Sequence, residues 1–534
     1  MSEPKKVDRR KFIYAGLGAV ALIAIGAAAY VAMNPPVVTV TKPTTSVVTT
    51  TVPTTSVVTT TVPTTSVVTT TVPTTSVVTT SAKKVPLNIW PSAFLNTVEE
   101  ARWGYLVSLF KDANPNIDVV FTPLPASGDD ANRKIVAAYT AGTGFPAILH
   151  NEGNVRYTLL GYCERVDDLV EEVKKRGGND LVANSIPKFM GPDKKPGYYM
   201  IPYGWKTDAM CTRFDILEKA GLKPDDVVSS FTNFDKSLYK IKQYLNESGL
   251  TKEGVYPLVV QLGPKATGDG SYAILRYIAT INGIPVATED LGLHIDQTPE
   301  QVKGIETAFA TFKRWFDDGI ITPDAPALTE YDNNAYFQTG KCVMTSNAIV
   351  SIYTWMEQNK PWFYPWFGVL PWPKSDVNGR SFVNPQPMCF SISTKLDPET
   401  RKIAKDFILF MLDPANYAKW WGDTGGYGQL ARADIPMYKS IVEKPPYTTS
   451  PLWKASRAIA LAGDFILSPW QIRPSFSRLS AEGSIVNIAA AVVQGQMTPK
   501  EAAQELIKAI YKAIEEEEGL ETINKDSPTV LPPP

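Results

Sequence analysis

Histidine is almost absent from this sequence of 534 residues, which contains only His150 and His294. A Ser-His-Asp triad, a Cys-His pair or a histidine-based zinc site would have to use one of these two, and neither stands in a sequence context typical of such a centre. No glycine-rich phosphate loop and no nucleophile elbow occurs either. We therefore expect no catalytic centre of these types, no metal and no cofactor. Glycoside hydrolysis by two carboxylates remains open, because that arrangement is geometric and is not visible as a spacing.

Cysteine is also scarce, and its four positions lie far apart in the sequence. No Cys-x-x-Cys spacing indicates a zinc or redox motif. Two interpretations remain open for the cysteines: one or two disulfides in an oxidising compartment, or buried free thiols. The positions are Cys163, Cys211, Cys342 and Cys389.

Neither positive nor negative charge dominates over most of the chain. Lysine and arginine number 53 against 54 acidic residues, and no long basic block follows the first few residues. Proteins that bind nucleic acid usually carry a basic patch that neutralises phosphates. We therefore expect no nucleic-acid partner.

The first 84 residues have the composition of an anchor and a stalk. Residues 1–11 are basic, and residues 12–33 are an uncharged apolar run of 22 residues, about 33 Å as a helix and long enough for a bilayer core. The positive-inside rule places the following residues outside the cell. Residues 34–84 are rich in Thr, Ser, Val and Pro and repeat the unit TTSVVTTTVP, which cannot bury a core. Whether residues 12–33 are a cleaved signal, including a twin-arginine signal suggested by RRKFI at 9–13, or a lasting anchor stays open.

Residues 85–525 have ordinary globular composition and alternate short apolar strands with amphipathic helices. The pattern predicts strands at 87–90, 117–122 and 145–150, and helices at 98–113, 131–141, 300–318 and 499–518. This alternation favours an α/β fold with a mostly parallel sheet, in which ligands bind at the carboxyl ends of the strands. Trp90, Asn151 and Glu152 are expected at that edge.

Seven short elements resemble, in order, those of the family 1 extracellular solute-binding proteins, the sugar receptors of ABC importers that are related to maltose-binding protein. They are LNIW at 87–90, AGTGFPAI at 141–148, YMIPY at 199–203, CTRFDILEKAGL at 211–222, FQTGKCVM at 337–344, GVLPWP at 368–373 and GQMTPKEA at 495–502. Each element is weak alone, but their common order over most of the chain makes the resemblance specific.

The resemblance implies a two-lobed periplasmic-binding-protein-like fold of type II that closes over its ligand at a hinge. We expect lobe 1 at about 85–208 and 389–445, lobe 2 at about 213–385 and 446–520, and a tail at 526–534. The implied function is a cell-surface receptor, tethered by its N-terminal helix, that delivers a carbohydrate to an ABC permease and has no catalytic activity. Stalked, anchored receptors of this composition are similar to archaeal surface proteins.

A sugar receptor needs flat aromatic faces for the ring and planar polar groups for its hydroxyls. The sequence supplies both types at expected loop positions. The candidate ligand-binding residues are Trp90, Phe94, Asn151, Glu152, Trp205, Asp208, Asp269, Tyr272, Asn347, Trp355, Tyr427 and Trp470.

Three other functions stay open at this point. A receptor for a peptide or polyamine would have fewer aromatics and more fixed charge in its cleft. A glycosidase would place Glu152 opposite Asp208 or Asp269. A purely structural surface protein would not respond to any ligand.

Overall fold

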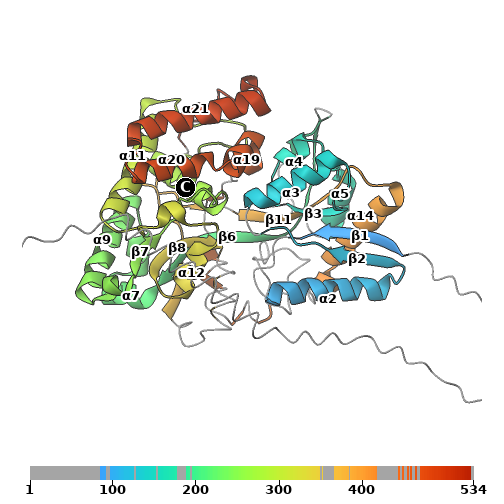
Figure 1. Cartoon of the computed structure of the whole chain (residues 1–534), viewed down its shortest axis with the longest axis horizontal. Helices are drawn as coiled ribbons and strands as arrows, with labels where there is room; N and C mark the ends of the chain where they lie inside the picture. The colour runs from blue at the N-terminus through green and yellow to red at the C-terminus, as the bar shows by residue number, and fades with distance from the viewer. Residues whose placement is uncertain are drawn as a thin grey trace, which may run out of the picture. The chain divides into compact units, whose positions relative to one another are not determined.

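A computed structural model shows a mixed α/β fold (Figure 1). The chain divides into two compact units, Met1–Thr79 and Thr80–Pro534. The structure describes residues 84–91, 97–125, 128–151, 154–176, 188–192, 195–348, 352, 356, 366–383, 385–417, 443–445, 448–449, 454–455, 458–459, 464–465 and 469–530.

The predicted membrane run, residues 12–33, and most of the stalk lie outside the described residues. Among the helices that are described, none combines the length and the apolar character needed to cross a bilayer.

The first lobe begins with the predicted β-α-β-α-β order, which is confirmed. Its strands are β1 (Val85–Trp90), β2 (Ile117–Phe121) and β3 (Ile148–Asn151), with β1 parallel to both of the others. Its first helices are α2 (Thr97–Ala113) and α3 (Gly128–Ala141). The third strand begins three residues later than predicted, after Pro146, which cannot donate a ladder hydrogen bond.

Strand β6 (Ile201–Arg213) is shared by the two lobes. At about 3.3 Å per residue its 13 residues span roughly 40 Å. Its first part pairs with β11 (Pro385–Ile392), and its second part, from Asp208 on, pairs with β8 (Cys342–Ala348) and β9 (Phe367–Leu370). The strands of both lobes thus form one sheet in the order β2-β1-β3-β11-β6-β8-β7, with β9 on β6 (Figure 1).

The prediction of a mostly parallel sheet is wrong for the middle of this sheet. Strand β11 runs antiparallel to both β3 and β6, and β6 runs antiparallel to β8 and β9. The reason is the connectivity: β6 leads from the first lobe into the second and β11 leads back, so the two run in opposite directions. Local alternation of helices and strands does not reveal such crossings.

The second lobe packs helices around β7 (Tyr256–Val259), which is parallel to β8. These helices are α9 (Phe231–Glu247), α10 (Asp269–Asn282), α11 (Pro299–Asp317), α20 (Ser484–Val493) and α21 (Pro499–Glu517). Helices α11 and α21 match the helices predicted at 300–318 and 499–518. Each starts at a threonine whose hydroxyl accepts a hydrogen bond from the backbone three residues on, followed by proline.

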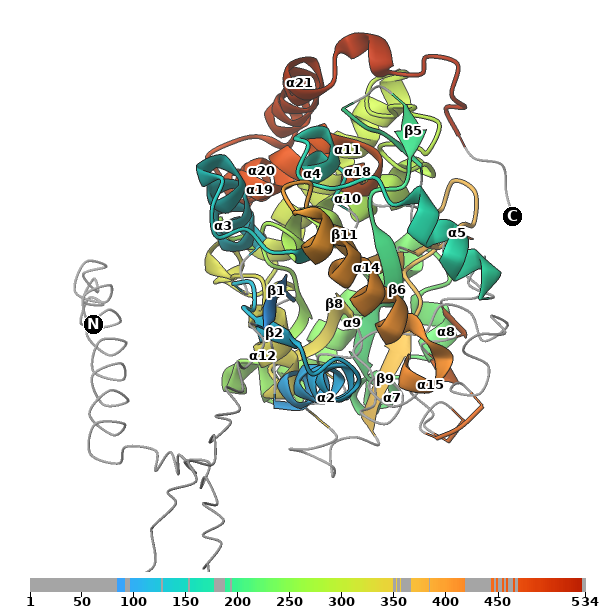
Figure 2. The same cartoon turned by 90° about the vertical axis from the view of Figure 1, so that its right-hand side faces the viewer.

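The core of the second lobe surrounds Trp315, Phe309 and Phe476, all fully buried. A second cluster lies in the first lobe around Trp103 and Phe407, and continues along β6 into the second lobe. In the first lobe, α5 (Asp167–Lys175) and α14 (Pro398–Leu412) lie close together, as Figure 2 also shows.

All four cysteines are buried free thiols, so the interpretation without disulfides is the one that the structure supports. Burial raises the pKa of Cys163 to about 12, which keeps this thiol protonated and unreactive. The apolar strands around Cys211 and Cys389 explain why these residues pack as small hydrophobic side chains.

Candidate ligand-binding site

A pocket in the second lobe brings together four of the predicted ligand-binding residues. Asp208 on β6, Asn347 on β8, and Asp269 and Tyr272 on α10 all line it. Their positions are as far apart in the sequence as 208 and 347, so only the fold places them together. The other lining residues are Leu258, Val259, Val260, Gln261, Ala273, Tyr277 and Ser346.

The sheet side of the pocket is polar and buried. Asp208 and Asn347 are each 5% exposed, and Asp208 stands beside this part of β8 in the antiparallel pairing. The side-chain amide of Asn347 donates to the side-chain oxygen of Asn334. The amide of Asn333 donates to the carbonyl oxygen of Ser346 at 3.0 Å. These bonds hold the side of the pocket at β8 in a fixed orientation.

The start of α10 forms the opposite side. The carboxylate of Glu330 accepts hydrogen bonds from the backbone nitrogens of Gly268 (3.0 Å) and Asp269 (2.8 Å). These are donors that a helix N-terminus otherwise leaves unpaired. A Cβ atom at Gly270 would lie 2.4 Å from the carbonyl oxygen of Gln261. Glycine is therefore needed for the helix to approach the end of β7 this closely.

Two aromatic side chains meet beside the pocket. The rings of Tyr272 and Trp470 are 5.3 Å apart between centroids and 72° apart in plane, an edge-to-face contact. Trp470 lies on α18 (Pro469–Ile472) and is half-buried against the core of the second lobe. Among the predicted aromatic residues whose side chains the structure describes, Tyr272 and Trp470 are the pair that lies near the polar groups of the pocket.

The cavity itself is small in this structure. Its cavity volume is about 10 Å³, which is room for about one water molecule. A sugar ring can enter only if the surrounding residues move apart.

Two other predicted residues are part of the first lobe. Trp90 is 4% exposed, and the Nζ atom of Lys134 lies 4.4 Å from its ring centroid. The amide nitrogen of Asn151 donates to the hydroxyl of Ser391 at 3.1 Å, and its side-chain oxygen accepts from the backbone nitrogen of Asn154 at 2.6 Å. Asn151 thus fixes the turn after β3.

For the remaining predicted residues the structure does not describe the side chains. Trp205 lies in β6 opposite Pro387, and only its backbone is described. Four others lie outside the described residues: Phe94, Glu152, Trp355 and Tyr427.

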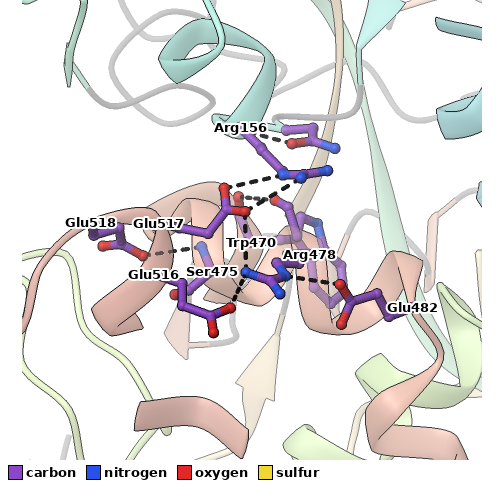
Figure 3. A network of polar contacts seen from close by, with 10 residues as sticks. Arg156, Trp470, Ser475, Arg478, Glu482, Glu516, Glu517 and Glu518 are labelled. Atoms are coloured by element: carbon purple, nitrogen blue, oxygen red, sulfur yellow. Dashed lines mark hydrogen bonds and ion pairs between the residues drawn. The ribbon is translucent and has the colours of Figure 1, made fainter. Parts of the chain in front are cut away.

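An ion-pair network joins the two lobes (Figure 3). Arg156 follows Asn151 at the carboxyl end of β3, on α4 (Arg156–Leu159), which packs beside α19 (Pro474–Ala481) of the second lobe. Its Nε and Nη2 atoms donate to the two carboxylate oxygens of Glu517 on α21 at 3.2 and 3.3 Å. Arg478 on α19 pairs with Glu516 at 2.7 Å and lies 3.6 Å from Glu517.

The sequence reasoning missed Gln261 of the pocket, and it also missed residues that support the pocket or join the lobes. Gln261 follows a strand at its carboxyl end, so the rule that selected Asn151 could have found it. Glu330 contacts α10 from a position about 60 residues away in the sequence, and no local signal marks it. Arg156 and Glu517 are ordinary charged residues that no local sequence pattern distinguishes. Their contact becomes visible only once the packing of α4 beside α19 is known.

Comparison with known proteins identifies the family. Residues 106–455 match the family described as bacterial extracellular solute-binding protein. This match spans well over half of the chain, so the chain belongs to that family. No protein with a curated description matches the sequence.

Solved structures share the fold over most of the chain. Maltose-bound MalE3 of T. maritima is 16% identical, with a TM-score of 0.63, 80% of this chain covered and 99% of that one. A solute-binding protein of Thermotoga lettingae bound with alpha-D-tagatose is 18% identical, with a TM-score of 0.62 and 81% and 100% covered. A sugar transporter protein of Arthrobacter chlorophenolicus with bound laminaribiose is 15% identical, with a TM-score of 0.62 and 80% and 99% covered. At these identities the likeness concerns the fold.

Proposed function

We propose that this protein is the extracellular receptor of an ABC importer, which binds a carbohydrate between its lobes and delivers it to the permease. The observation that carries this proposal is the convergence of Asp208, Asp269, Asn347 and Tyr272 on one pocket of the second lobe, with Trp470 beside it. In this proposal the pocket is the second lobe's part of the binding site. The family supports a binding function, and the sugars in the three similar structures support a carbohydrate.

The chemistry of the pocket suits a neutral polyhydroxylated ligand. Carboxylates accept two hydrogen bonds from neighbouring hydroxyls, and Asn and Gln amides both donate and accept. The C–H face of a sugar ring packs on an aromatic ring. A ligand hydroxyl left without a partner in this buried site costs about 1–3 kcal/mol, so the pocket discriminates by its hydrogen-bond pattern.

The proposal extends to the rest of the chain. Residues 12–33 anchor the protein in the membrane, residues 34–84 act as a stalk, and the binding part carries no catalytic activity. The lobes comprise about 85–208 with 389–445, and 213–385 with 446–520. The long apolar run, the basic flank before it and the repeats after it support this arrangement.

The test is a calorimetric and thermal-shift screen of the fragment from Thr80 on, which forms a compact unit, against mono- and oligosaccharides. Binding to the folded state raises the unfolding free energy by about 2.7 kcal/mol at a hundredfold excess over Kd. Saturable binding without a released product is expected. Turnover of the sugar would identify a glycosidase instead, and no response to any saccharide would refute the proposal.

A second candidate is a receptor for a cationic solute such as a polyamine. The observation that favours it is the presence of two carboxylates, Asp208 and Asp269, in one small pocket. Spermidine and putrescine therefore belong in the same screen. Binding of a polyamine would weaken steeply with salt because it depends on charge, whereas binding of a neutral sugar would not.

A further inference from the structure

Arg276 is a buried arginine on α10, one helical turn beyond Tyr272 of the pocket. Its exposed fraction is 1%. Its Nε atom donates to the carbonyl oxygen of Phe382 at 2.8 Å. In the part of the chain that the structure describes, the buried Nη1 and Nη2 atoms have no hydrogen-bond partner.

The guanidinium group of Arg276 lies between two aromatic rings. Its central carbon is 4.1 Å from the ring centroid of Trp372 and 5.4 Å from that of Tyr272. Trp372 is itself fully buried, and its indole nitrogen donates to the hydroxyl of Thr280 at 2.8 Å. Tyr272 in turn contacts Trp470. A continuous row thus leads from the fixed ring of Trp372 through Arg276 to the aromatic pair beside the pocket.

This arrangement is unfavourable for stability taken alone. Among the described residues Arg276 forms no ion pair. Buried donors without acceptors and a buried charge without a counter-ion both destabilise the folded state. A methionine of similar length would fill the same space without either cost. Arg276 therefore lowers stability at a position that contacts Tyr272 of the pocket. A residue that is unfavourable for stability next to a binding site indicates a role in function.

We propose that Arg276 is a positioning residue for the ligand site. Its flat guanidinium group, held by Phe382 and Trp372, fixes the ring of Tyr272 in the orientation that presents it to the pocket and to Trp470. Direct recognition of an anionic ligand fits the site less well, because Asp208 and Asp269 line the same pocket. The role in sugar binding rests on the proposed function, whereas the effect on the aromatic pair does not.

The experiment compares Arg276→Met and Arg276→Lys with wild type in the fragment from Thr80 on. Arg314→Met is the matched control, because Arg314 also stacks on a tyrosine, Tyr239, at 5.5 Å, and its interactions lie outside the pocket. Three quantities are measured: the thermal midpoint, the affinity for maltose, and the fluorescence of Trp470, isolated as the difference from the same protein carrying Trp470→Phe.

For Arg276→Met we expect an unchanged or higher midpoint, a changed Trp470 spectrum, and affinity for maltose about tenfold weaker. Arg276→Lys should share the spectral and binding defects, because an ammonium group cannot stack flat between two rings. The control should leave the Trp470 spectrum and the affinity as in wild type.

The inference is overturned if the Trp470 spectrum of Arg276→Met equals that of wild type, or if lysine restores it fully. It is also overturned if Arg276→Met lowers the midpoint and leaves binding intact, because the residue would then be structural only. Failure of wild type to bind maltose or any other saccharide would count against the proposed function, while the fluorescence of Trp470 would still decide the role of Arg276.

Discussion

Replacing Arg156 with methionine removes the ion pair between the lobes and should loosen their arrangement. The pair has two charge-assisted hydrogen bonds, at 3.2 and 3.3 Å. The side chains are 23% and 13% exposed, so solvent screens the pair only in part. It joins α4 of the first lobe to α21 of the second through side chains alone, so it is a contact that movement of the lobes can break.

The expected size of the effect follows from this geometry. Exposed ion pairs contribute about 0–1 kcal/mol, and hydrogen bonds to charged groups about 1.5–3 kcal/mol. The loss of Arg156 does not leave Glu517 alone, because Arg478 stays 3.6 Å away. We therefore expect about 1 kcal/mol, which changes the equilibrium between lobe arrangements by roughly fivefold.

The assay is a distance distribution between two spin labels, attached at Val120→Cys in the first lobe and Val377→Cys in the second. Both positions are exposed, and the four native cysteines are buried, so labelling is selective. Arg156→Met should broaden the distribution without ligand. High salt should shift wild type the same way.

Lys111→Met is the control, because it removes an exposed ion pair with Asp118 inside the first lobe. If Arg156→Met gives the same distance distribution as this control, the pair does not hold the lobes together. The same conclusion would follow if the distribution in wild type did not respond to salt.

Three further predictions follow from individual contacts. Asp208→Asn should weaken binding of a neutral sugar by about tenfold in calorimetry, whereas a loss of a hundredfold or more for a polyamine would indicate the second candidate function. Burial lowers the pKa of His294 below its ordinary value of 6.5, so the folded protein keeps this histidine neutral to a lower pH than the unfolded chain does. Stability is then full above about pH 6.5 and falls as the pH drops through the window below it, because the unfolded chain takes up the proton first. Denaturant titrations from pH 7.5 to 5 should show this decrease and a smaller one in His294→Gln; equal slopes would refute it. Ser230→Ala should lower the free energy of unfolding by about 1 kcal/mol, because the Ser230 hydroxyl accepts from the backbone nitrogen of Asn233 at 3.0 Å and caps α9, and an unchanged urea midpoint would contradict this.

The local elements were the most predictable part of the structure. Helices such as Pro299–Asp317 and Pro499–Glu517 are marked in the sequence by a threonine cap, a following proline and an apolar stripe. The strands of the first lobe are short apolar runs ended by proline or by polar residues. These signals act within a few residues, so a single sequence contains them.

The candidate site was predictable only in part. Residue chemistry pointed to Asp208, Asp269, Tyr272 and Asn347, and the pocket contains them. The same reasoning selected Trp90 and Asn151, which the structure buries in the first lobe. An aromatic or amide residue at the end of a strand looks the same in the sequence whether it faces a ligand or completes a core.

The sequence by itself determined the residue types, the order of the first strands and helices, and the resemblance to the solute-binding family. The tertiary structure alone decided that β6 and β11 cross between the lobes, that Glu330 caps α10, that Arg276 lies between Trp372 and Tyr272, and that Arg156 meets Glu517. Each of these depends on residues that are tens to hundreds of positions apart. Such contacts arise from the packing of whole elements, and no local pattern of hydrophobicity or charge specifies which distant partner a side chain meets.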